Sequence, residues 1–495
     1  GTKSTAATSV PTGTYDVTET ALAGWTLTDA SCTGATAVKS GSKLTITATA
    51  NANIVCTYTN TRDSGTIKVV KNTVGGNGTF NFTSNITGLN NFDLTTVGNT
   101  AATAAVPVPT GTYSLAEVIP STYSLTGLSC TGGQTSVQSP SVSITVGKGD
   151  NVVCTYTNTR NTATLTVIKN TVGGNATFNF TSNTALGDFA LTTVGGTKST
   201  VATTIPTGTY DITETATAGW SLTNLVCTGT NAPVYAGGKV TINAATSQNI
   251  VCTYTNTRDQ GTVTIIKNTV GGNGTFGFTT DTSLGNFNLT TVLGTATTST
   301  VSANTGNYNI SETVPTGWTL TSKDCVATNP IFSPNGPLVS STSNGVVINV
   351  TKGANIVCTF TNTRDTGSIT VVKNTVGGNG TFSFSTNTPL GSFDLTTVGG
   401  TKSTSTVSLN TGVYNLAESV PAGWTLADLN CTGTTQSKNF PSVQITVAKG
   451  ENVVCTFSNS RDTGTIQVVK NAVGGNASFS FNSNTSLGNF NLATV

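Results

Sequence analysis

The chain has 495 residues and a formal net charge of +2, and only 8% of its residues are charged, against roughly 25% in typical soluble domains. It contains no histidine, so the commonest general base and the commonest metal ligand are both missing. Without a basic patch, nucleic acid and anionic membrane are not expected as partners. We expect no cofactor and no metal, and no segment that inserts into a membrane.

Internal repeats divide the chain. Lysines that follow two β-branched residues and precede an asparagine stand at 71, 169, 267, 373 and 470, so the spacings are 98, 98, 106 and 97 residues. A unit of about a hundred residues can bury its own core, which favours self-sufficient modules. The predicted divisions are 1–62, the C-terminal part of a module; 63–160, 161–258 and 365–461, complete modules; 259–364, a complete module with a loop insertion; and 462–495, the N-terminal strands of a module.

Each module is predicted to be all-β. In 63–160, short alternating runs separated by turn residues indicate about seven strands and no helix. Strands of this number and spacing are typical of an immunoglobulin-like β-sandwich. Three runs, at 66–71, 111–117 and 152–158, place the following residues on inward faces: Ile67, Val69 and Lys71; Tyr113, Leu115 and Glu117; Cys154, Tyr156 and Asn158.

The joints between modules contain few residues outside strands. Short joints restrict bending, so we expect an extended rod. The extra residues of the module 259–364 lie near Pro330–Gly345, between its two cysteines, and are predicted to form a surface loop.

The ten cysteines come in one pair per repeat, with no residue left over. This even count predicts five disulfides within modules, which would persist only in an oxidising compartment. Buried free thiols in a reduced cell are the alternative. The predicted pairs, which are 24, 24, 25, 33 and 24 residues apart, are Cys32–Cys56, Cys130–Cys154, Cys227–Cys252, Cys325–Cys358 and Cys431–Cys455.

A lysine, a glutamate and an asparagine recur on inward faces at similar offsets. Burial should lower the pKa of the amine and raise that of the carboxyl. A neutral amine could then attack the asparagine carboxamide and release ammonia, with the glutamate moving the protons. The alternatives are a buried ion pair and a lysine that reaches solvent at its strand end. The four sets are Lys71, Glu117 and Asn158; Lys169, Glu214 and Asn256; Lys267, Glu312 and Asn362; Lys373, Glu418 and Asn459.

The two end segments hold complementary parts of one set. Residues 1–62 contain Glu19 and Asn60 without the lysine, and residues 463–495 contain Lys470 without the other two. One interpretation is a window from a longer array. The other is strand donation between copies, in which Lys470 would bond Asn60 of a neighbour with Glu19 as the promoter.

Three sequence features resemble a known family. They are the first-strand lysine (Val70-Lys71), the last-strand asparagine, and a Tyr-x-Leu/Val-x-Glu box followed by Gly-aromatic, as in Tyr15–Glu19 with Gly24-Trp25 and in Tyr414–Glu418 with Gly423-Trp424. In these features, over the whole chain, the sequence resembles the Cna-B/SpaA-type prealbumin-like domains of bacterial surface adhesins and pilins. The resemblance implies a prealbumin-like fold with an intramolecular lysine–asparagine isopeptide bond, promoted by the glutamate.

Together these observations predict an extracellular structural stalk or filament that bears load at a microbial cell surface and associates with copies of itself. An enzyme would have little reason to repeat one active site in nearly identical modules, and none of these modules contains a histidine. We therefore do not expect an enzyme. The alternative function is an adhesin whose modules bind a glycan or a host protein, with the insertion at Ile331–Leu338 as the best candidate. The recurring Trp25, Trp220, Trp318 and Trp424, with Tyr123 in the remaining module, are expected to be core or cap residues, and carbohydrate stacking is the alternative.

Overall fold

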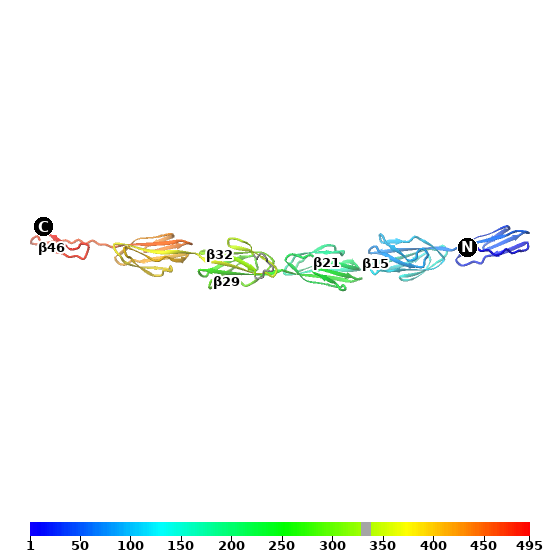
Figure 1. The fold of residues 1–495 in the computed structure, drawn as a ribbon, viewed down its shortest axis with the longest axis horizontal. Coiled ribbons are helices and arrows are strands. Elements are labelled where there is room, and N and C mark those ends of the chain that lie inside the picture. The colour runs from blue at the N-terminus through cyan, green and yellow to red at the C-terminus, as the bar shows by residue number, and fades with distance from the viewer. Residues whose placement is uncertain (328–337) are drawn as a thin grey trace. The chain divides into compact units, whose positions relative to one another are not determined.

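The computed structural model describes residues 1–327 and 338–495. The chain divides into two units, Gly1–Arg258 and Asp259–Val495, and each is described by itself. No described residue is helical, and strands form a series of sandwich modules (Figure 1). The predicted all-β class and the tandem β-sandwich modules are confirmed.

The module 63–160 shows the pattern that the other complete modules repeat. It has ten strands rather than the expected seven or so, because β9, β10 and β13 are edge strands of three to five residues, too short to show alternation in the sequence. Its strands are β6 (Ser64–Val74), β7 (Thr79–Ser84), β8 (Phe92–Thr95), β9 (Thr100–Ala102), β10 (Val106–Pro109), β11 (Gly111–Val118), β12 (Tyr123–Thr131), β13 (Gln134–Gln138), β14 (Ser141–Val146) and β15 (Asn151–Arg160).

Two sheets face each other in this module. One has the order β10-β6-β15-β12, with β9 also paired to β6, and the other has the order β13-β14-β11-β7-β8. The first strand, β6, and the last strand, β15, lie side by side and run parallel, with Lys71 opposite Tyr156 and Asn158 opposite Thr73. This pairing places the two ends of the module's chain in adjacent strands.

The core lies between the sheets. Alternating residues of β6, Ile67 and Val69, are fully buried, as are Phe80 of β7 and Ile144 of β14. Phe82 packs edge-on against Tyr156, with ring centroids 5.0 Å apart. Such close packing of large apolar side chains supplies most of the stabilisation of the module and leaves little room for an unpaired charge.

The strands of the remaining complete modules correspond one to one, apart from differences near the insertion. In 161–258 they are β16 (Thr162–Val172), β17 (Thr177–Ser182), β18 (Phe189–Thr192), β19 (Thr197–Ser199), β20 (Thr203–Pro206), β21 (Gly208–Glu214), β22 (Trp220–Thr228), β23 (Val234–Ala236), β24 (Lys239–Ala244) and β25 (Asn249–Arg258). In 259–364 they are β26 (Gln260–Val270), β27 (Thr275–Thr280), β28 (Phe287–Thr290), β29 (Thr295–Thr297), β30 (Val301–Asn304), β31 (Gly306–Thr313), β32 (Trp318–Ala327), β33 (Leu338–Ser341), β34 (Gly345–Val350) and β35 (Asn355–Arg364). In 365–461 they are β36 (Thr366–Val376), β37 (Thr381–Thr386), β38 (Phe393–Thr396), β39 (Thr401–Ser403), β40 (Val407–Asn410), β41 (Gly412–Ser419), β42 (Trp424–Thr432), β43 (Thr435–Asn439), β44 (Ser442–Val447) and β45 (Asn452–Arg461).

The end segments contain fewer strands. Residues 1–62 form two small sheets, with the orders β1-β4-β3 and β2-β5, and residues 462–495 form the pair β46-β47. Their strands are β1 (Gly13–Thr18), β2 (Trp25–Thr33), β3 (Thr36–Ser40), β4 (Lys43–Ala48), β5 (Val55–Arg62), β46 (Ser478–Phe481) and β47 (Phe490–Ala493).

Five disulfides join the cysteines in the pairs that the sequence indicated. In the module 63–160, Cys130 of β12 lies directly opposite Cys154 of β15. The bond therefore fixes the pairing of these two strands, and it closes a loop with a sequence separation of 24 residues.

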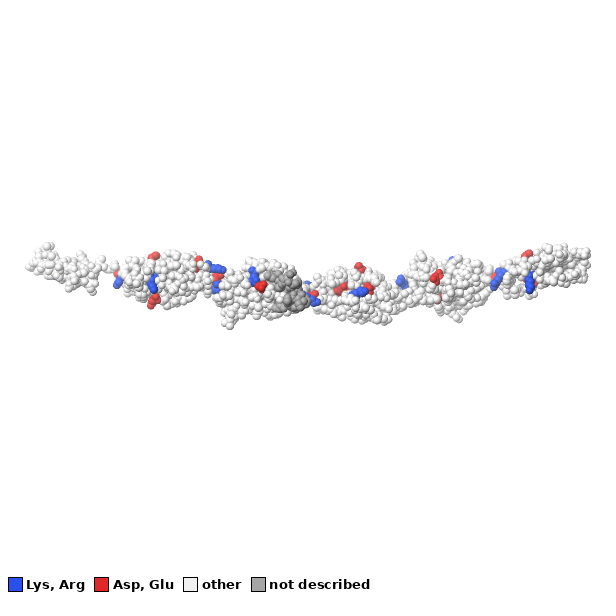
Figure 2. Space-filling view, in the orientation of Figure 1, with Lys and Arg blue, Asp and Glu red and all other residues white. Residues whose placement is uncertain are grey.

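Charged side chains are sparse on the surface. On the face that Figure 2 shows, they are scattered rather than gathered into a large patch of one sign. No helix among the described residues has the length and apolar character needed to cross a membrane. In the same part of the chain, no group of three or more His, Cys, Asp or Glu residues could hold a metal ion.

The position of the disulfide predicts a local effect on stability. Replacing Cys130 and Cys154 together by alanine is expected to lower the free energy of unfolding of the module 63–160 by about 2–4 kcal/mol, because the unfolded chain regains loop entropy. Hydrogen exchange followed by mass spectrometry should show faster exchange in β12 and β15. The unaltered modules of the same chain serve as controls, and equal protection in all modules would contradict the expectation.

Candidate functional site

Strand alternation places one lysine of each complete module in the core. In β6, the lysine follows Ile67 and Val69 on the inward face, and the Lys71 side chain is fully buried. Its Nζ lies 4.4 Å from the centre of the Phe80 ring and 3.3 Å from the backbone oxygen of Tyr156. The alternative in which this lysine reaches solvent is therefore wrong.

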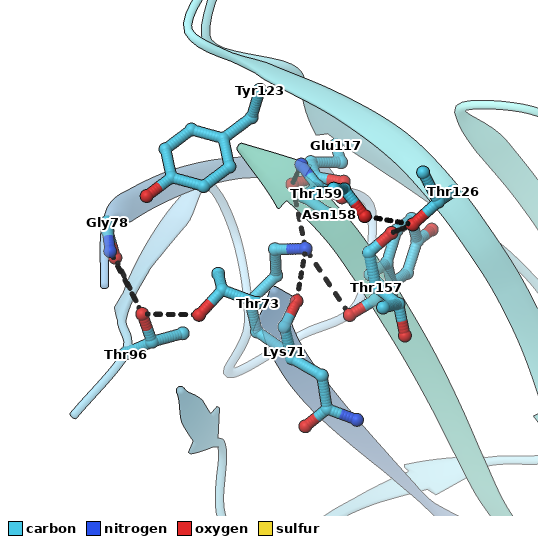
Figure 3. A network of polar contacts seen from close by, with 12 residues as sticks. Lys71, Thr73, Gly78, Thr96, Glu117, Tyr123, Thr126, Thr157, Asn158 and Thr159 are labelled. Carbon is cyan, nitrogen blue, oxygen red and sulfur yellow. Dashed lines mark hydrogen bonds and ion pairs between the residues drawn. The ribbon is translucent and has the colours of Figure 1, made fainter. Parts of the chain in front are cut away.

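The glutamate approaches from the opposite sheet. Glu117 of β11 is buried, and its Oε1 lies 3.4 Å from Nζ of Lys71. The same oxygen accepts a hydrogen bond of 2.7 Å from Nδ2 of Asn158, which is buried on β15. Figure 3 shows the three side chains converging between the sheets. The structure thus brings together the three residues that the sequence singled out.

The other complete modules repeat this arrangement. The Nζ-to-carboxyl distances are 3.3 Å for Lys169 and Glu214, 3.6 Å for Lys267 and Glu312, and 3.8 Å for Lys373 and Glu418. In these three modules the amine also donates a hydrogen bond to the asparagine Oδ1, at 2.6 Å to Asn256, 2.9 Å to Asn362 and 2.6 Å to Asn459. The asparagine Nδ2 donates to the glutamate in each case.

Burial shifts the pKa of both ionisable groups toward their neutral forms. Loss of water lowers the pKa of Lys71 from 10.5 to about 8, although the nearby Glu117 opposes the change. The same cause lowers the pKa of Lys267 and Lys373 to about 8, and it lowers that of Lys169. Burial raises the pKa of the Glu117 carboxyl, against the opposing effects of Lys71 and Asn158.

The carboxyl of Glu117 also has an oxygen without a hydrogen bond. Its Oε2 is buried and receives none from the described residues, and the same holds for Oε2 of Glu312. A buried oxygen that carries ionic charge without a donor is costly, so this environment favours a protonated carboxyl.

These positions meet the chemical requirements for amide formation. A neutral amine is a nucleophile, a carboxamide carbonyl is an electrophile, and a neutral carboxylic acid beside both can give and take a proton. An amine hydrogen-bonded to the carboxamide oxygen is also close to the reacting carbon. The arrangement is thus chemically suited to one acyl transfer per module, and the amine is hydrogen-bonded to the carboxamide in three of the four complete modules.

The phenylalanine below the lysine is a residue whose role the sequence did not reveal. Phe80 lies on the inward face of β7, where its ring contacts the amine of Lys71. Its signal was a phenylalanine that recurs nine residues after each lysine. The equivalent distances from Nζ to the ring centre are 4.3 Å at Phe178, 4.4 Å at Phe276 and 4.4 Å at Phe382.

The end segments contain only parts of the site. Nδ2 of Asn60 donates a hydrogen bond to Oε1 of Glu19, as in the complete modules. Nζ of Lys470 lies 4.2 Å from the centre of the Phe479 ring. A bond between Lys470 and Asn60 of another copy stays a prediction.

Two other expectations concern aromatic residues and the insertion. Trp220 and Trp318 are buried and pack edge-on against Phe178 and Phe276, which favours their predicted role in the core. Trp25, in the incomplete module, is 42% exposed. The candidate ligand segment Ile331–Leu338 lies outside the described residues, except for Leu338 at the start of β33.

Comparison with a family model finds one repeated domain. The model of a prealbumin-like fold domain matches residues 1–62, 67–160, 165–258, 263–364 and 369–461. No curated protein matches the chain.

Solved structures give only distant likenesses. The Bacillus anthracis TIE protein is 13% identical, with a TM-score of 0.32, and the match covers 90% of this chain and 76% of that one. The pilus adhesin SpaC of Lactobacillus rhamnosus GG, in its open conformation, is 12% identical, with a TM-score of 0.23 and coverage of 70% and 56%. The major pilin T-13 of Streptococcus pyogenes is 15% identical, with a TM-score of 0.23 and coverage of 41% and 97%. Because each TM-score is below 0.5, we base no argument on them.

Proposed function

The chain belongs to the family of prealbumin-like fold domains, as its sequence features indicated, and we propose that it is an extracellular stalk or filament of covalently stapled modules at a microbial cell surface. One observation carries the proposal: each complete module buries an amine and a carboxamide that both contact one carboxyl, and the amine and carboxamide belong to its first and last strands. Paired cysteines favour an extracellular location. Copies of the same chain are the proposed partners, and the divisions between modules are those given by the repeats.

In the proposed reaction, Nζ of the neutral lysine attacks Cγ of the asparagine. The bond from Cγ to Nδ2 then breaks, and ammonia leaves. The protonated glutamate gives its proton to the departing nitrogen and takes one from the attacking amine, so it ends unchanged. No oxidant or reductant is needed, and the reaction occurs once per module without turnover.

The mechanical benefit follows from the parallel pairing of the end strands. Tension applied to the two ends of the module would enter at β6, its first strand, and leave at β15, its last strand. A bond between Lys71 and Asn158 would pass this tension from one strand to the next. The residues between them, including the disulfide-closed loop, would then carry no load.

Intact mass after reduction tests the bond directly. The expected mass is that of the sequence less one ammonia for each of the four complete modules. Lys169→Ala should remove one of these losses, whereas Lys148→Ala, at a mostly exposed lysine, should remove none. A mass equal to the plain sequence would reject the crosslinks.

The rate of bond formation should depend on pH in a bell-shaped manner. The reactive pair consists of a neutral amine and a neutral acid, and it contains the same number of titratable protons as the ion pair. The fraction of modules in the reactive form is therefore constant between the two pKa values. At a pH below the raised pKa of Glu117, the pair holds one more proton, so the amine is charged and unreactive. At a pH above about 8, the pKa of Lys71, the pair has lost its last proton, so the carboxyl is no longer a neutral acid. Mass measured during refolding at several pH values gives the profile. An alkaline limit near the ordinary lysine pKa of roughly 10.4 would contradict the proposal.

Single-molecule stretching tests the mechanical function. The unaltered complete modules should not lengthen, because the crosslink bypasses the sandwich. Lys169→Ala should add one unfolding event, and reductant should lengthen that event by the segment between Cys227 and Cys252, which are 25 residues apart. Four unfolding events in the unaltered chain would show that the complete modules are not protected from tension.

A further inference from the structure

A β-bulge lies opposite the asparagine of every module. In β12, Leu125 is paired with Asn158 and Gly127 is paired with Thr157, so Thr126 between them is an extra residue. Bulges re-aim nearby side chains and are frequent beside active sites. The same shift stands opposite Asn60, Asn256, Asn362 and Asn459, between Leu27 and Asp29, Leu222 and Asn224, Leu320 and Ser322, and Leu426 and Asp428.

The extra residue contacts the residues on both sides of the asparagine, the backbone of one and the side chain of the other. The Thr126 hydroxyl lies 3.2 Å from the backbone oxygen of Thr157 and donates to it, and it lies 3.0 Å from Oγ1 of Thr159. One hydroxyl can donate one hydrogen bond and accept another, so both contacts can exist together. Figure 3 shows these threonines beside Asn158. We call the set formed by Thr126, Thr157 and Thr159 the threonine tie.

Three further modules contain the same tie at nearly the same distances. The hydroxyl of the bulge threonine donates to the backbone oxygen of the residue before the asparagine. The distances are 3.0 Å from Thr28 to Thr59, 3.1 Å from Thr223 to Thr255, and 3.1 Å from Thr321 to Thr361. The same hydroxyl also contacts the hydroxyl of the threonine after the asparagine, at 3.1 Å for Thr61, 3.1 Å for Thr257 and 3.2 Å for Thr363.

The tie and the reactive side chain lie on opposite faces of the sheet. Thr126 is exposed, while the Asn158 side chain is buried in the core. The tie can therefore restrain the asparagine without touching the lysine or the glutamate. The disulfide between Cys130 and Cys154 fixes the pairing of the same two strands, so a slip in register cannot remove the bulge.

One module lacks the tie but keeps the bulge. In 365–461, Ala427 replaces the bulge threonine, and Ser458 and Ser460 replace the two threonines that flank Asn459. The three positions thus change together. Because this module still folds with its lysine 2.6 Å from the Asn459 oxygen, the tie is not required to form the site. A role for the tie is therefore limited to how tightly the asparagine is held.

From this geometry we propose that the threonine tie is a positioning device that speeds lysine–asparagine bond formation. The proposal rests on the crosslinking function above. Contacts to the backbone before Asn158 and to the side chain after it restrain this residue, which keeps the amide carbon within the approach of the amine for a larger fraction of time. Because the Thr126 hydroxyl is exposed, water competes for its hydrogen bonds. The expected gain in the rate of crosslinking is therefore modest, about threefold to tenfold.

The test follows crosslinking in each module of the full chain. The chain is recovered unfolded from inclusion bodies in acidic urea, where the amines are protonated, and is then folded in a glutathione redox buffer. Samples are quenched with acid, reduced and digested, and the crosslinked peptides of each module are quantified by mass. The variants are Thr126→Val, which removes the hydroxyl at constant shape, Thr126→Ser, which retains it, and Ala427→Thr, which adds it.

The expected result is that Thr126→Val slows crosslinking threefold to tenfold only in the module 63–160, and that Thr126→Ser restores the rate. Ala427→Thr should speed crosslinking in 365–461, a gain that misfolding cannot produce. Equal rates in all variants would overturn the positioning role while leaving the crosslinking function intact. If no module of the unaltered chain loses ammonia, both proposals fail.

Discussion

Removal of a lysine amine from water is the constraint on which the rest of the site depends. Lys71 is fully buried, and its charged form would be very unstable there without compensation. The surrounding groups reduce that cost through an adjacent carboxyl, a carbonyl oxygen and the face of an aromatic ring. They do not restore the hydration of the amine, so its pKa falls to about 8. The core that stabilises the module therefore also favours the neutral, nucleophilic form of the amine.

The two kinds of covalent staple have different consequences because they join different strands. The disulfide links β12 to β15, which are antiparallel neighbours, and acts within the sheet. The proposed amide links β6 to β15, the strands through which the chain enters and leaves the module. With the proposed amide in place, the disulfide would lie outside the path of tension. Its contribution is then to the stability and register of the sheet rather than to tensile strength.

Alternation was enough to place Lys71, Glu117 and Asn158 on inward faces. A strand has a period of two residues, and the residue two positions before each of them is a large apolar or aromatic one. The spacing of the repeats was enough to predict tandem modules of about a hundred residues. The bulge at Thr126 could not be predicted, since it depends on the register between strands that are distant in sequence. The contact between Lys71 and Phe80 likewise depends on how β7 folds back onto β6. The edge strands β9, β10 and β13 are too short to leave a periodic signal.

The recurrence of the triad is difficult to explain by stability alone. Four of the 22 basic residues and four of the 20 acidic residues lie buried in cores, in a chain with little charge to spare. Apolar side chains of similar volume often stabilise a protein as much as a buried ion pair, or more. An ion pair also has no need of an asparagine, which in three of the four complete modules is hydrogen-bonded to both the lysine and the glutamate. The proposed reaction needs all three groups at once, and it would turn the unfavourable burial of the amine into the condition for a permanent bond.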